Sequence, residues 1–410
     1  MTGERPTLSD SLRKRLERAV ERADRQLRRT VQTWPATRPA PIHTVKGRWH
    51  RPRDLWTDWT PGFYAGQMWI LHKVLGEEYW RKNAEDFSRS LADRRFDRGV
   101  HDLGFIFLSS YGRWLEVLED DDPLAARLKD VLVTAGTVQS FRWNGNGEDG
   151  FIYSFNGPQS LFIDVMMNVR LLFAAHRISA DARERSADVR GLGDPDRVLQ
   201  RALEHSRTSA RYLVRTDGNE LGAEAGSVAH EAIFNTEPGR GEFRCLSTQQ
   251  GYSPFTCWAR GLAWALYGFA AVYRDSGEKE FLEVAERCAE FYQRHTPENG
   301  VPHWEYGAPN LPDEPLDSSA AAVAGCGLLI LSALTKSAQR RASYVRWSLK
   351  IAETLADDEF LGSEKNGEEG VLLHGVYHRP RGWGVDASSM WGDYFFLELL
   401  ERLLVGAGRY

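Results

Sequence analysis

Two kinds of helical segment alternate along the chain, and this alternation restricts the fold more than any other feature of the sequence. One kind is rich in apolar, small and aromatic residues on all sides, whereas the other has a charged face. Helices that are apolar all round lie buried, and helices with a charged face lie at the surface. Apolar segments are expected near residues 62–75, 103–117, 160–177, 258–274, 319–336 and 389–405, and amphipathic ones near 8–33, 78–93, 123–139, 195–214, 278–294 and 338–355.

Six segments of each kind in alternation predict an inner ring of helices inside an outer ring, the all-α fold known as the (α/α)6 toroid. Strand signals are scarce, with short candidates near 151–155, 228–234 and 371–378. No linker rich in Pro, Gly or Ser divides the 410 residues, so we expect residues 1–410 to form a single domain. The N-terminal amphipathic helix over 8–33 is expected to belong to the outer ring.

The loops that enter the inner helices of such a toroid converge on one mouth, where this sequence is rich in Trp, Tyr, Gly and amide side chains. Aromatic faces stack on the C–H surfaces of sugars, and amides and carboxylates bind sugar hydroxyls. The mouth therefore suits a carbohydrate, although Trp in large α proteins is mostly a core residue. The segments are WTPGFYAG at 59–66, HD at 101–102, WNGNG at 143–147, QQGY at 249–252, Trp304 and WG at 383–384.

Two aspartates in unlike settings are the strongest candidates for catalysis. Asp102 stands at the expected N-terminus of a helix, where the helix dipole and free N–H groups favour the ionised carboxylate. Asp164 lies within the apolar stretch 160–177, where burial inside a helix favours the protonated carboxyl. Carboxyls whose surroundings drive their pKa values apart suit acid–base chemistry on sugars. The alternative is that Asp102 only caps a helix and Asp164 is a hydrogen-bonded core residue.

Charge and cysteine content argue against several classes of protein. The net charge of −5 and the pI near 6.2 argue against nucleic acid or a membrane surface as a partner. The four cysteines occur singly, without a CxxC motif, so we expect reduced thiols in the core. Residues 1–9 contain no apolar segment of a secretory signal, and no stretch reaches the roughly 18 apolar residues that a membrane span needs. We therefore expect a cytoplasmic protein.

The motifs of common cofactor and metal sites are absent from the sequence. It contains no GxxxxGK[ST] and no GxGxxG between a strand and a helix, so neither a nucleotide nor a dinucleotide is expected. It contains no HExxH and no cluster of His and Cys with ligand spacing, so no metal is expected. A Ser-centred nucleophile elbow is also missing. We therefore expect no cofactor, and carboxylates remain the best catalytic candidates.

Seven strings of residues follow one another in an order that matches a known family. They are WTPGF at 59–63, HDLGF at 101–105, FIDVMMN at 162–168, QGY at 250–252, WARGLAWALYG at 258–268, DSSAA at 317–321 and WGDY at 391–394. In these strings the chain resembles the unsaturated glucuronyl hydrolases, glycoside hydrolase family 88. One string would be weak evidence, but seven in order over nearly the whole chain are specific. The resemblance implies an (α/α)6 barrel, the same fold that the helix alternation predicts.

The resemblance implies that Asp164 is the general acid and base and that Asp102 is the second essential carboxylate. Such an enzyme acts on the sugar that a polysaccharide lyase leaves with a C4=C5 double bond conjugated to its carboxylate. It protonates C4, water attacks C5, and the hydrated sugar opens and expels the remaining saccharide. Asp164, kept protonated by burial, would give the proton, while ionised Asp102 would stabilise the positive charge at C5.

A set of substrate-binding residues is also implied by the resemblance. Arg260 and Trp264 are four residues apart on one expected helix and would share a face toward the substrate. The others are Gln250 at the reacting centre, Trp59 stacked on the sugar ring, His230 as the site histidine of the family, and Ser388 or Ser389 near the substrate carboxylate. Gln249 and Leu262 stand where the family commonly has His and Gln, and both changes bear on the preferred substrate.

Two other functions fit the same fold, and the fold alone cannot choose among them. The first is a sugar epimerase or an ordinary inverting glycosidase, although epimerases on this fold use paired histidines that this sequence lacks. The second is a saccharide-binding protein without catalysis, which would not need a desolvated Asp164. The expected ligand is an unsaturated uronyl oligosaccharide, from chondroitin, hyaluronan, heparin, ulvan or another uronide. We expect a monomer or a homodimer.

Overall fold

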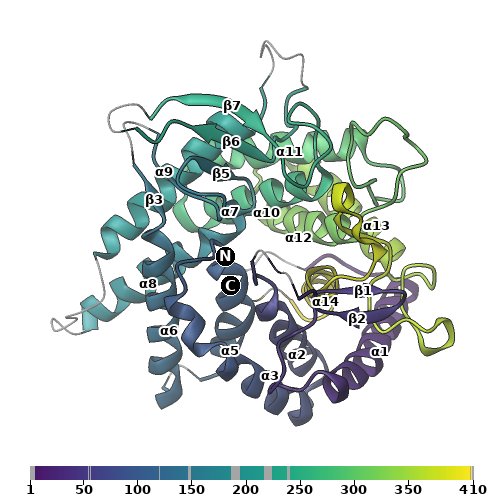
Figure 1. The fold of residues 1–410 in the computed structure, drawn as a ribbon. Coiled ribbons are helices and arrows are strands. Elements are labelled where there is room, and N and C mark those ends of the chain that lie inside the picture. Colours follow the sequence, from purple (N-terminus) through teal and green to yellow (C-terminus); the bar gives the residue numbers. More distant parts are fainter. Residues whose placement is uncertain are drawn as a thin grey trace.

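Helices in two concentric rings make up most of the structure, a computed structural model (Figure 1). It describes residues 5–53, 55, 57–119, 121–145, 149–185, 194–216, 224–237, 241–406 and 408. The inner ring contains α2 (Pro61–Leu75), α4 (Leu103–Phe107), α7 (Val165–Asn168), α8 (Arg170–Arg185), α10 (Ala259–Ser276), α12 (Ser318–Leu334) and α14 (Met390–Leu404). The outer ring contains α1 (Asp10–Thr33), α3 (Glu78–Ser90), α6 (Pro123–Ser140), α9 (Pro195–Leu213), α11 (Lys279–His295) and α13 (Ala338–Leu355). The predicted (α/α)6 toroid is confirmed.

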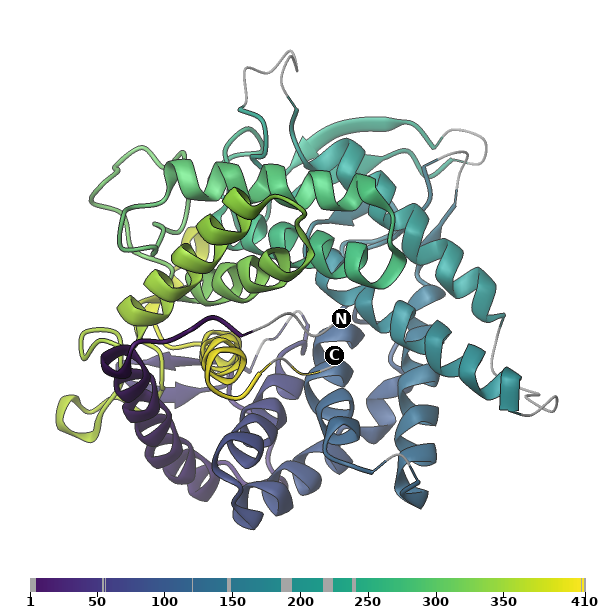
Figure 2. The ribbon, with the colours of Figure 1, turned by 180° about the vertical axis from the view of Figure 1, so that it is seen from behind.

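The inner ring is closed by α14, which packs against α12 on one side and against α2 on the other. Contacts continue round the ring from α2 to α4, from α4 to α7 and α8, from α7 to α10, and from α10 to α12. The outer helix α1 packs against α13 and α14, and Figure 2 shows it from behind at the edge of the ring. The guanidinium of Arg5 donates to the carbonyl of Leu404 at 2.8 Å, so the beginning and end of the chain meet.

The inner helix predicted over 103–117 is interrupted by a π-helical turn. This turn, η2 (Leu108–Gly112), separates α4 from α5 (Arg113–Glu116). The backbone of α2 approaches this segment closely because Gly62 and Gly66 carry no side chain. A Cβ at Gly62 would lie 2.2 Å from the carbonyl oxygen of Ile106, and one at Gly66 would lie 2.8 Å from that of Ser109. Two glycines four residues apart therefore set the distance between these inner helices.

The segment predicted as one helix over 160–177 begins with a strand. Residues Ser160–Phe162 form β5, which pairs antiparallel with β6 (Glu231–Phe234), and β6 pairs with β7 (Phe243–Ser247). Helix formation starts only after Asp164, with α7 and then α8. A short apolar run is compatible with either a buried strand or a buried helix, and here pairing with the distant β6 decides.

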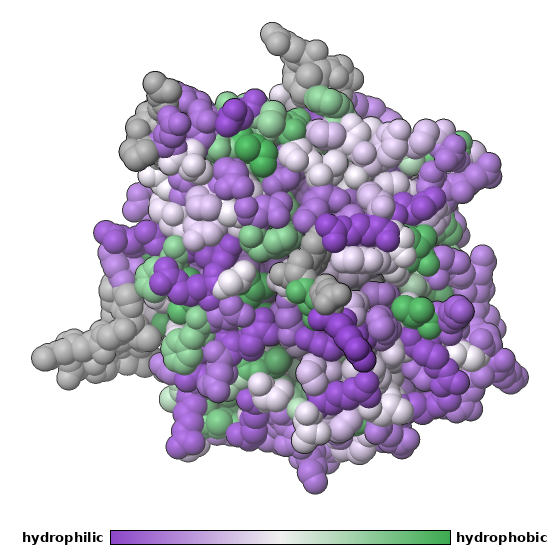
Figure 3. All heavy atoms as spheres, in the orientation of Figure 1, coloured by the Kyte–Doolittle hydropathy of each residue, from purple (hydrophilic) through white to green (hydrophobic). Residues whose placement is uncertain are grey.

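Short antiparallel strand pairs lie on the side of the ring that faces the viewer in Figure 1. They are β1 (His43–Val45) with β2 (Arg48–His50), β3 (Trp143–Asn144) with β4 (Phe151–Ile152), and β8 (Gly375–His378) with β9 (Trp383–Ala387). Each of the three predicted strand regions contains one observed strand. Figure 3 shows that this face is mostly hydrophilic, with apolar side chains in small scattered groups. Within the described residues, no helix is long and apolar enough to cross a membrane.

Candidate active site

A cavity at the mouth of the ring is lined by side chains from distant parts of the chain. Trp59, Asp102, Asp164 and Gln250, all predicted as site residues, line this cavity. Each precedes an inner helix, so the ring itself brings them together. The other lining residues are Thr57, His101, Phe155, Phe162 and Tyr377. Of the predicted mouth segment 143–147, residues 146 and 147 lie outside the described part of the chain.

Both aspartates stand directly before a short helix. Asp102 precedes α4 and Asp164 precedes α7, and neither side chain hydrogen-bonds to the backbone N–H groups of its helix. The expected place of Asp164 inside a helix is therefore wrong, because pairing of β5 with β6 keeps the chain extended up to Phe162. Both side chains are nonetheless buried, with 4% of Asp102 and 9% of Asp164 exposed.

Asp102 is approached on a single oxygen by two donors. The amide nitrogen of Asn168 donates to Oδ1 at 3.1 Å, and Nε2 of His101 lies 3.4 Å from the same atom. Nδ1 of His101 accepts from the backbone N–H of Phe155 at 3.0 Å, and burial lowers the pKa of His101 to about 3. The ring is therefore neutral and carries its proton on Nε2, facing Asp102. Oδ2 is the oxygen of Asp102 left for a ligand.

Asp164 also lies beside a histidine, His230, whose tautomer is fixed in the same way as that of His101. Nδ1 of His230 accepts from the backbone N–H groups of Gln249 and Gln250 at 3.0 and 3.2 Å. The ring proton is thus on Nε2, which lies 3.4 Å from Oδ2 of Asp164. This Oδ2 is buried and has no hydrogen-bond partner among the described residues. An ionised oxygen that is buried without a hydrogen-bond partner is destabilised, so the geometry favours a ligand or a proton there.

The two carboxyls differ in proton affinity, in the reverse of the predicted order. Burial raises the pKa of Asp102 well above its usual range, and the negative charge of Asp164 raises it further. Burial also raises the pKa of Asp164, but the nearby His230, His101 and Arg260 together outweigh burial, so the net shift is downward. Neighbouring carboxyls resist joint ionisation, so these directions favour Asp102 over Asp164 as the holder of a proton in the free site.

Arg260 of α10 lies behind the cavity wall and holds parts of it in place. It is 1% exposed. Its guanidinium donates to Oδ2 of Asp317 at 3.1 Å and to Oε1 of Gln250 at 2.8 Å. It also donates to the carbonyl of Tyr377 at 2.7 Å and to the carbonyl of Val376. Arg260 therefore holds the Gln250 amide and the β8–β9 hairpin in one arrangement.

Three predicted binding residues lie in the interior beside the cavity. Trp264 is 1% exposed and packs against Phe105 and Phe395, with ring centroids 5.0 and 5.3 Å apart. The hydroxyl of Ser389 caps α14 by accepting a backbone N–H of its first turn, and Ser388 is fully buried. The cavity is lined without these three side chains, and their contact with a substrate stays a prediction.

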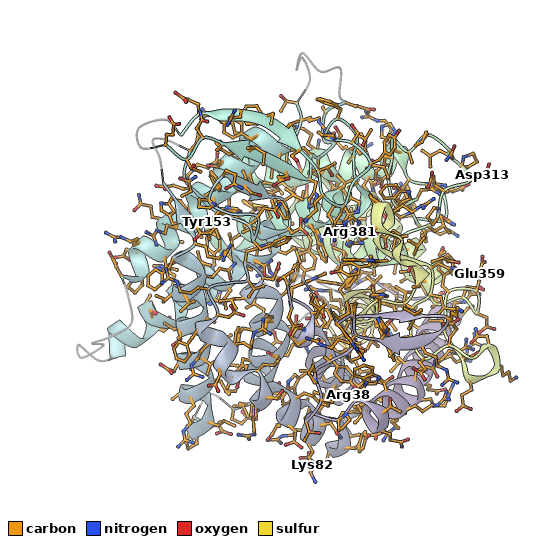
Figure 4. The ribbon with its side chains drawn as sticks, in the orientation of Figure 1. Arg38, Lys82, Tyr153, Asp313, Glu359 and Arg381 are labelled. Carbon is orange, nitrogen blue, oxygen red and sulfur yellow. The ribbon has the colours of Figure 1, made fainter. Side chains whose placement is uncertain are left out.

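Sequence reasoning assigned no role to the other five lining residues, among them His101 and Tyr377. His101 stands directly before Asp102 in the HDLGF string, so its position was a usable signal. Tyr377 had no local signal, because the β8–β9 hairpin brings it to the cavity and Arg260 fixes its carbonyl. The turn of this hairpin carries Arg381, which Figure 4 shows nearer the middle of the face than Asp313.

The chain is similar along most of its length to known hydrolases, although no family model matches it. It is 33% identical over 369 residues to the unsaturated glucuronyl hydrolase of Bacillus sp. strain GL1. The aligned region covers 86% of this chain and 88% of that protein. The chain belongs to the unsaturated glucuronyl hydrolases. It is therefore a glycoside hydrolase, and membership of this family argues against an epimerase, an ordinary inverting glycosidase and a non-catalytic binding protein.

Other unsaturated glucuronyl hydrolases show the same relationship. The enzyme of Formosa agariphila is 29% identical over 350 residues, 84% of this chain and 80% of that protein. A solved unsaturated glucuronyl hydrolase specific for heparin superposes with a TM-score of 0.80 at 28% identity, covering 95% of this chain and 97% of the other. The solved Bacillus enzyme gives the same TM-score and covers 96% and 97%.

Proposed function

We propose that this chain hydrolyses oligosaccharides that end in an unsaturated Δ4,5 uronyl residue, the products of polysaccharide lyases. The observation that carries the proposal is the buried pair of carboxyls, Asp102 and Asp164, in one cavity with the indole of Trp59 and the amide of Gln250. Relatives in sequence include an unsaturated chondroitin disaccharide hydrolase of Streptococcus pyogenes, which supports this class of substrate.

The proton shared by the two carboxyls starts the proposed reaction. A bound uronate brings a negative charge into the cavity and displaces water, and both effects raise the pKa of Asp164. Its orphaned Oδ2 then takes the proton that Asp102 holds in the free site. Asp164 delivers this proton to C4, the electrons of the double bond form the new C–H bond, and positive charge develops at C5. Ionised Asp102 stabilises that charge.

Water completes the reaction at C5. As the water oxygen bonds to C5, Asp164 accepts a proton from it and regains the acid form. The resulting hemiketal opens to a ketone, and the hemiacetal left at C1 expels the remaining saccharide. One water is consumed, and the glycosidic oxygen needs no acid from the enzyme. In this scheme Trp59 stacks on the sugar ring, while His230 and Gln250 orient the reacting centre.

Location and assembly form a separate part of the proposal. We propose a cytoplasmic enzyme that acts as a monomer or homodimer, without a nucleic-acid or membrane partner. Cys257, Cys288 and Cys326 are free and buried, as expected of thiols in a reducing compartment, whereas Cys245 is also free but exposed, so its expected place in the core is wrong. The acidic net charge of −5 also fits a protein that does not bind nucleic acid.

Unsaturated disaccharides prepared with lyases test the proposed reaction, because hydration removes the ultraviolet absorbance of the conjugated double bond. In heavy water, deuterium should appear at C4 of the early product. An unsaturated thioglycoside should react at a rate comparable to its oxygen counterpart, since no proton has to reach the linking atom. An ordinary glycosidase must protonate that atom. Efficient cleavage of a saturated glucuronide, or inertness of a thioglycoside with a good aglycone, would contradict the proposal.

A further inference from the structure

Several contacts fix the orientation of the His101 ring. Its ring stacks on Phe155, with centroids 5.4 Å apart and an angle of 10°, and meets the edge of Phe162 at 5.7 Å and 82°. Its Nδ1 accepts the backbone N–H of Phe155, and its carbonyl accepts the amide of Gln139 at 2.9 Å. Only 2% of the residue is exposed. These contacts fix the ring with its Nε2 3.4 Å from Oδ1 of Asp102.

The contacts of Asp102 indicate how the Nε2–H of His101 affects this carboxyl. Asn168 and His101 both address Oδ1, at 3.1 and 3.4 Å. An oxygen that faces two donors carries no proton, so the proton of the carboxyl pair sits on Oδ2 when Asp102 holds it. A donor also stabilises the ionised carboxylate, which weakens the hold of Asp102 on this proton.

We propose that His101 is a positioning residue that acts through Asp102. Its Nε2–H directs the shared proton to Oδ2 and eases the release of that proton toward Asp164. This inference rests on the proposed function of the two carboxyls. The other titratable or charged groups near His101 and Asp102 are Asp164, His230, Arg142 and His205, and the two His101 variants below leave all four in place.

Two substitutions separate the two polar contacts of the ring, the hydrogen bond with Phe155 and the 3.4 Å approach to Asp102. In His101→Asn the amide oxygen can replace Nδ1 and accept from Phe155, but the donor to Asp102 is lost. In His101→Gln the amide nitrogen can replace Nε2 and donate to Asp102, but the acceptor for Phe155 is lost. The matched control is His205→Asn, because His205 is also fully buried and its Nδ1 accepts the backbone N–H of Ile152 at 3.1 Å.

Asp102 without its histidine donor should keep the proton more firmly. For His101→Asn we expect kcat to fall about 10-fold or more at an unchanged KM, as for the loss of a polar contact with a charged group. The basic limb of its pH profile of kcat/KM should move to higher pH. His101→Gln should keep the wild-type pH profile and lose thermal stability, since the Phe155 N–H is left without an acceptor. His205→Asn should leave the pH profile unchanged.

The variants can contradict the role of His101 and the proposed function separately. If His101→Asn keeps the wild-type kcat and pH profile while Asp102→Asn is inactive, His101 has no positioning role and the proposed function stands. If both His101 variants lose activity without any shift of the basic limb, the role of His101 is only structural. If Asp102→Asn is active, the proposed function itself fails. Should His101→Asn not fold, nitrogen NMR of the wild-type enzyme decides, since a proton on Nδ1 of His101 contradicts the inference.

Discussion

At the scale of single residues, two carboxyls with similar burial have different neighbours and therefore different tasks. Asp164 is the proposed proton carrier, so Asp164→Asn should lower kcat about 10²-fold or more at a nearly unchanged KM. Asp102→Asn should also be severe, because it removes the resting place of the proton and the charge near C5. Loss of ultraviolet absorbance measures both variants, with circular dichroism to show that they fold. Asp313→Asn, at the periphery in Figure 4, is the control that should stay fully active.

The identity of these residues could be predicted from the sequence, but their order of proton affinity could not. Asp102 and Asp164 stand in strings that are specific enough to place them at the site. Their pKa values depend on His230, which is far from Asp164 in sequence and reaches it only through the pairing of β5 with β6. An expectation built on helix position alone therefore gave the two pKa shifts in the opposite directions.

At the scale of elements, the contact between α4 and α7 holds the two aspartates in register. Asn168 of α7 accepts the N–H of Phe105 at 2.8 Å and donates to Oδ1 of Asp102 and to the carbonyl of Asp164, both at 3.1 Å. A Cβ on Gly104 would lie 2.5 Å from the Cα of Asn168. Only glycine lets the two backbones come this close.

Substitution of Gly104 by alanine should therefore damage catalysis beyond its effect on stability. We expect Gly104→Ala to cost about 1–3 kcal/mol of unfolding free energy, as overpacking does. It should also lower kcat roughly 10²-fold, because it moves the carboxyls by a fraction of an ångström or more. In the control Gly136→Ala, a new Cβ would lie 2.7 Å from that of Ala175, between α6 and α8. This control should lose similar stability in urea titrations and keep its kcat, and equal kcat values for the two variants would contradict the argument.

Most elements could be predicted from periodicity, because a face that is buried leaves its pattern in the sequence. All predicted helices occur, with bounds within a few residues except in two inner segments. Over 160–162 the strand β5 depends on its partner β6, and over 108–112 the π turn depends on the close approach of α2. Both exceptions arise from contacts between distant segments, which no local pattern contains.

At the scale of the whole molecule, one buried carboxyl should make stability depend on pH. Asp393 of α14 accepts the backbone N–H groups of Val371 and Leu372 at 2.9 and 2.8 Å, and burial raises its pKa to about 7. In the unfolded chain an aspartate has a pKa of about 3.9. Folding therefore takes up a proton between these values, so the stabilisation is full below about pH 4 and is lost as the pH rises through about 7.

The variant Asp393→Asn should remove this dependence. Between about pH 4 and pH 7, the wild-type free energy of unfolding should fall more steeply than that of the variant, by roughly 1.4 kcal/mol per pH unit. Urea titrations across this range measure both slopes. The new amide can itself lower the free energy of unfolding, but that loss does not depend on pH and so does not change the slope. Parallel curves for the two proteins would show that Asp393 is ionised throughout.

The closure of the ring by α14 also has a consequence for how the protein is made. A ribosome adds about 5–20 residues per second, so α2 leaves it on the order of tens of seconds before α14. During that time the apolar side of α2 that α14 covers in the finished ring is not yet covered by α14. Every residue proposed for proton transfer already exists in the nascent chain, yet the site stays open until the final helix emerges. The growing chain therefore exposes this apolar surface for most of its synthesis.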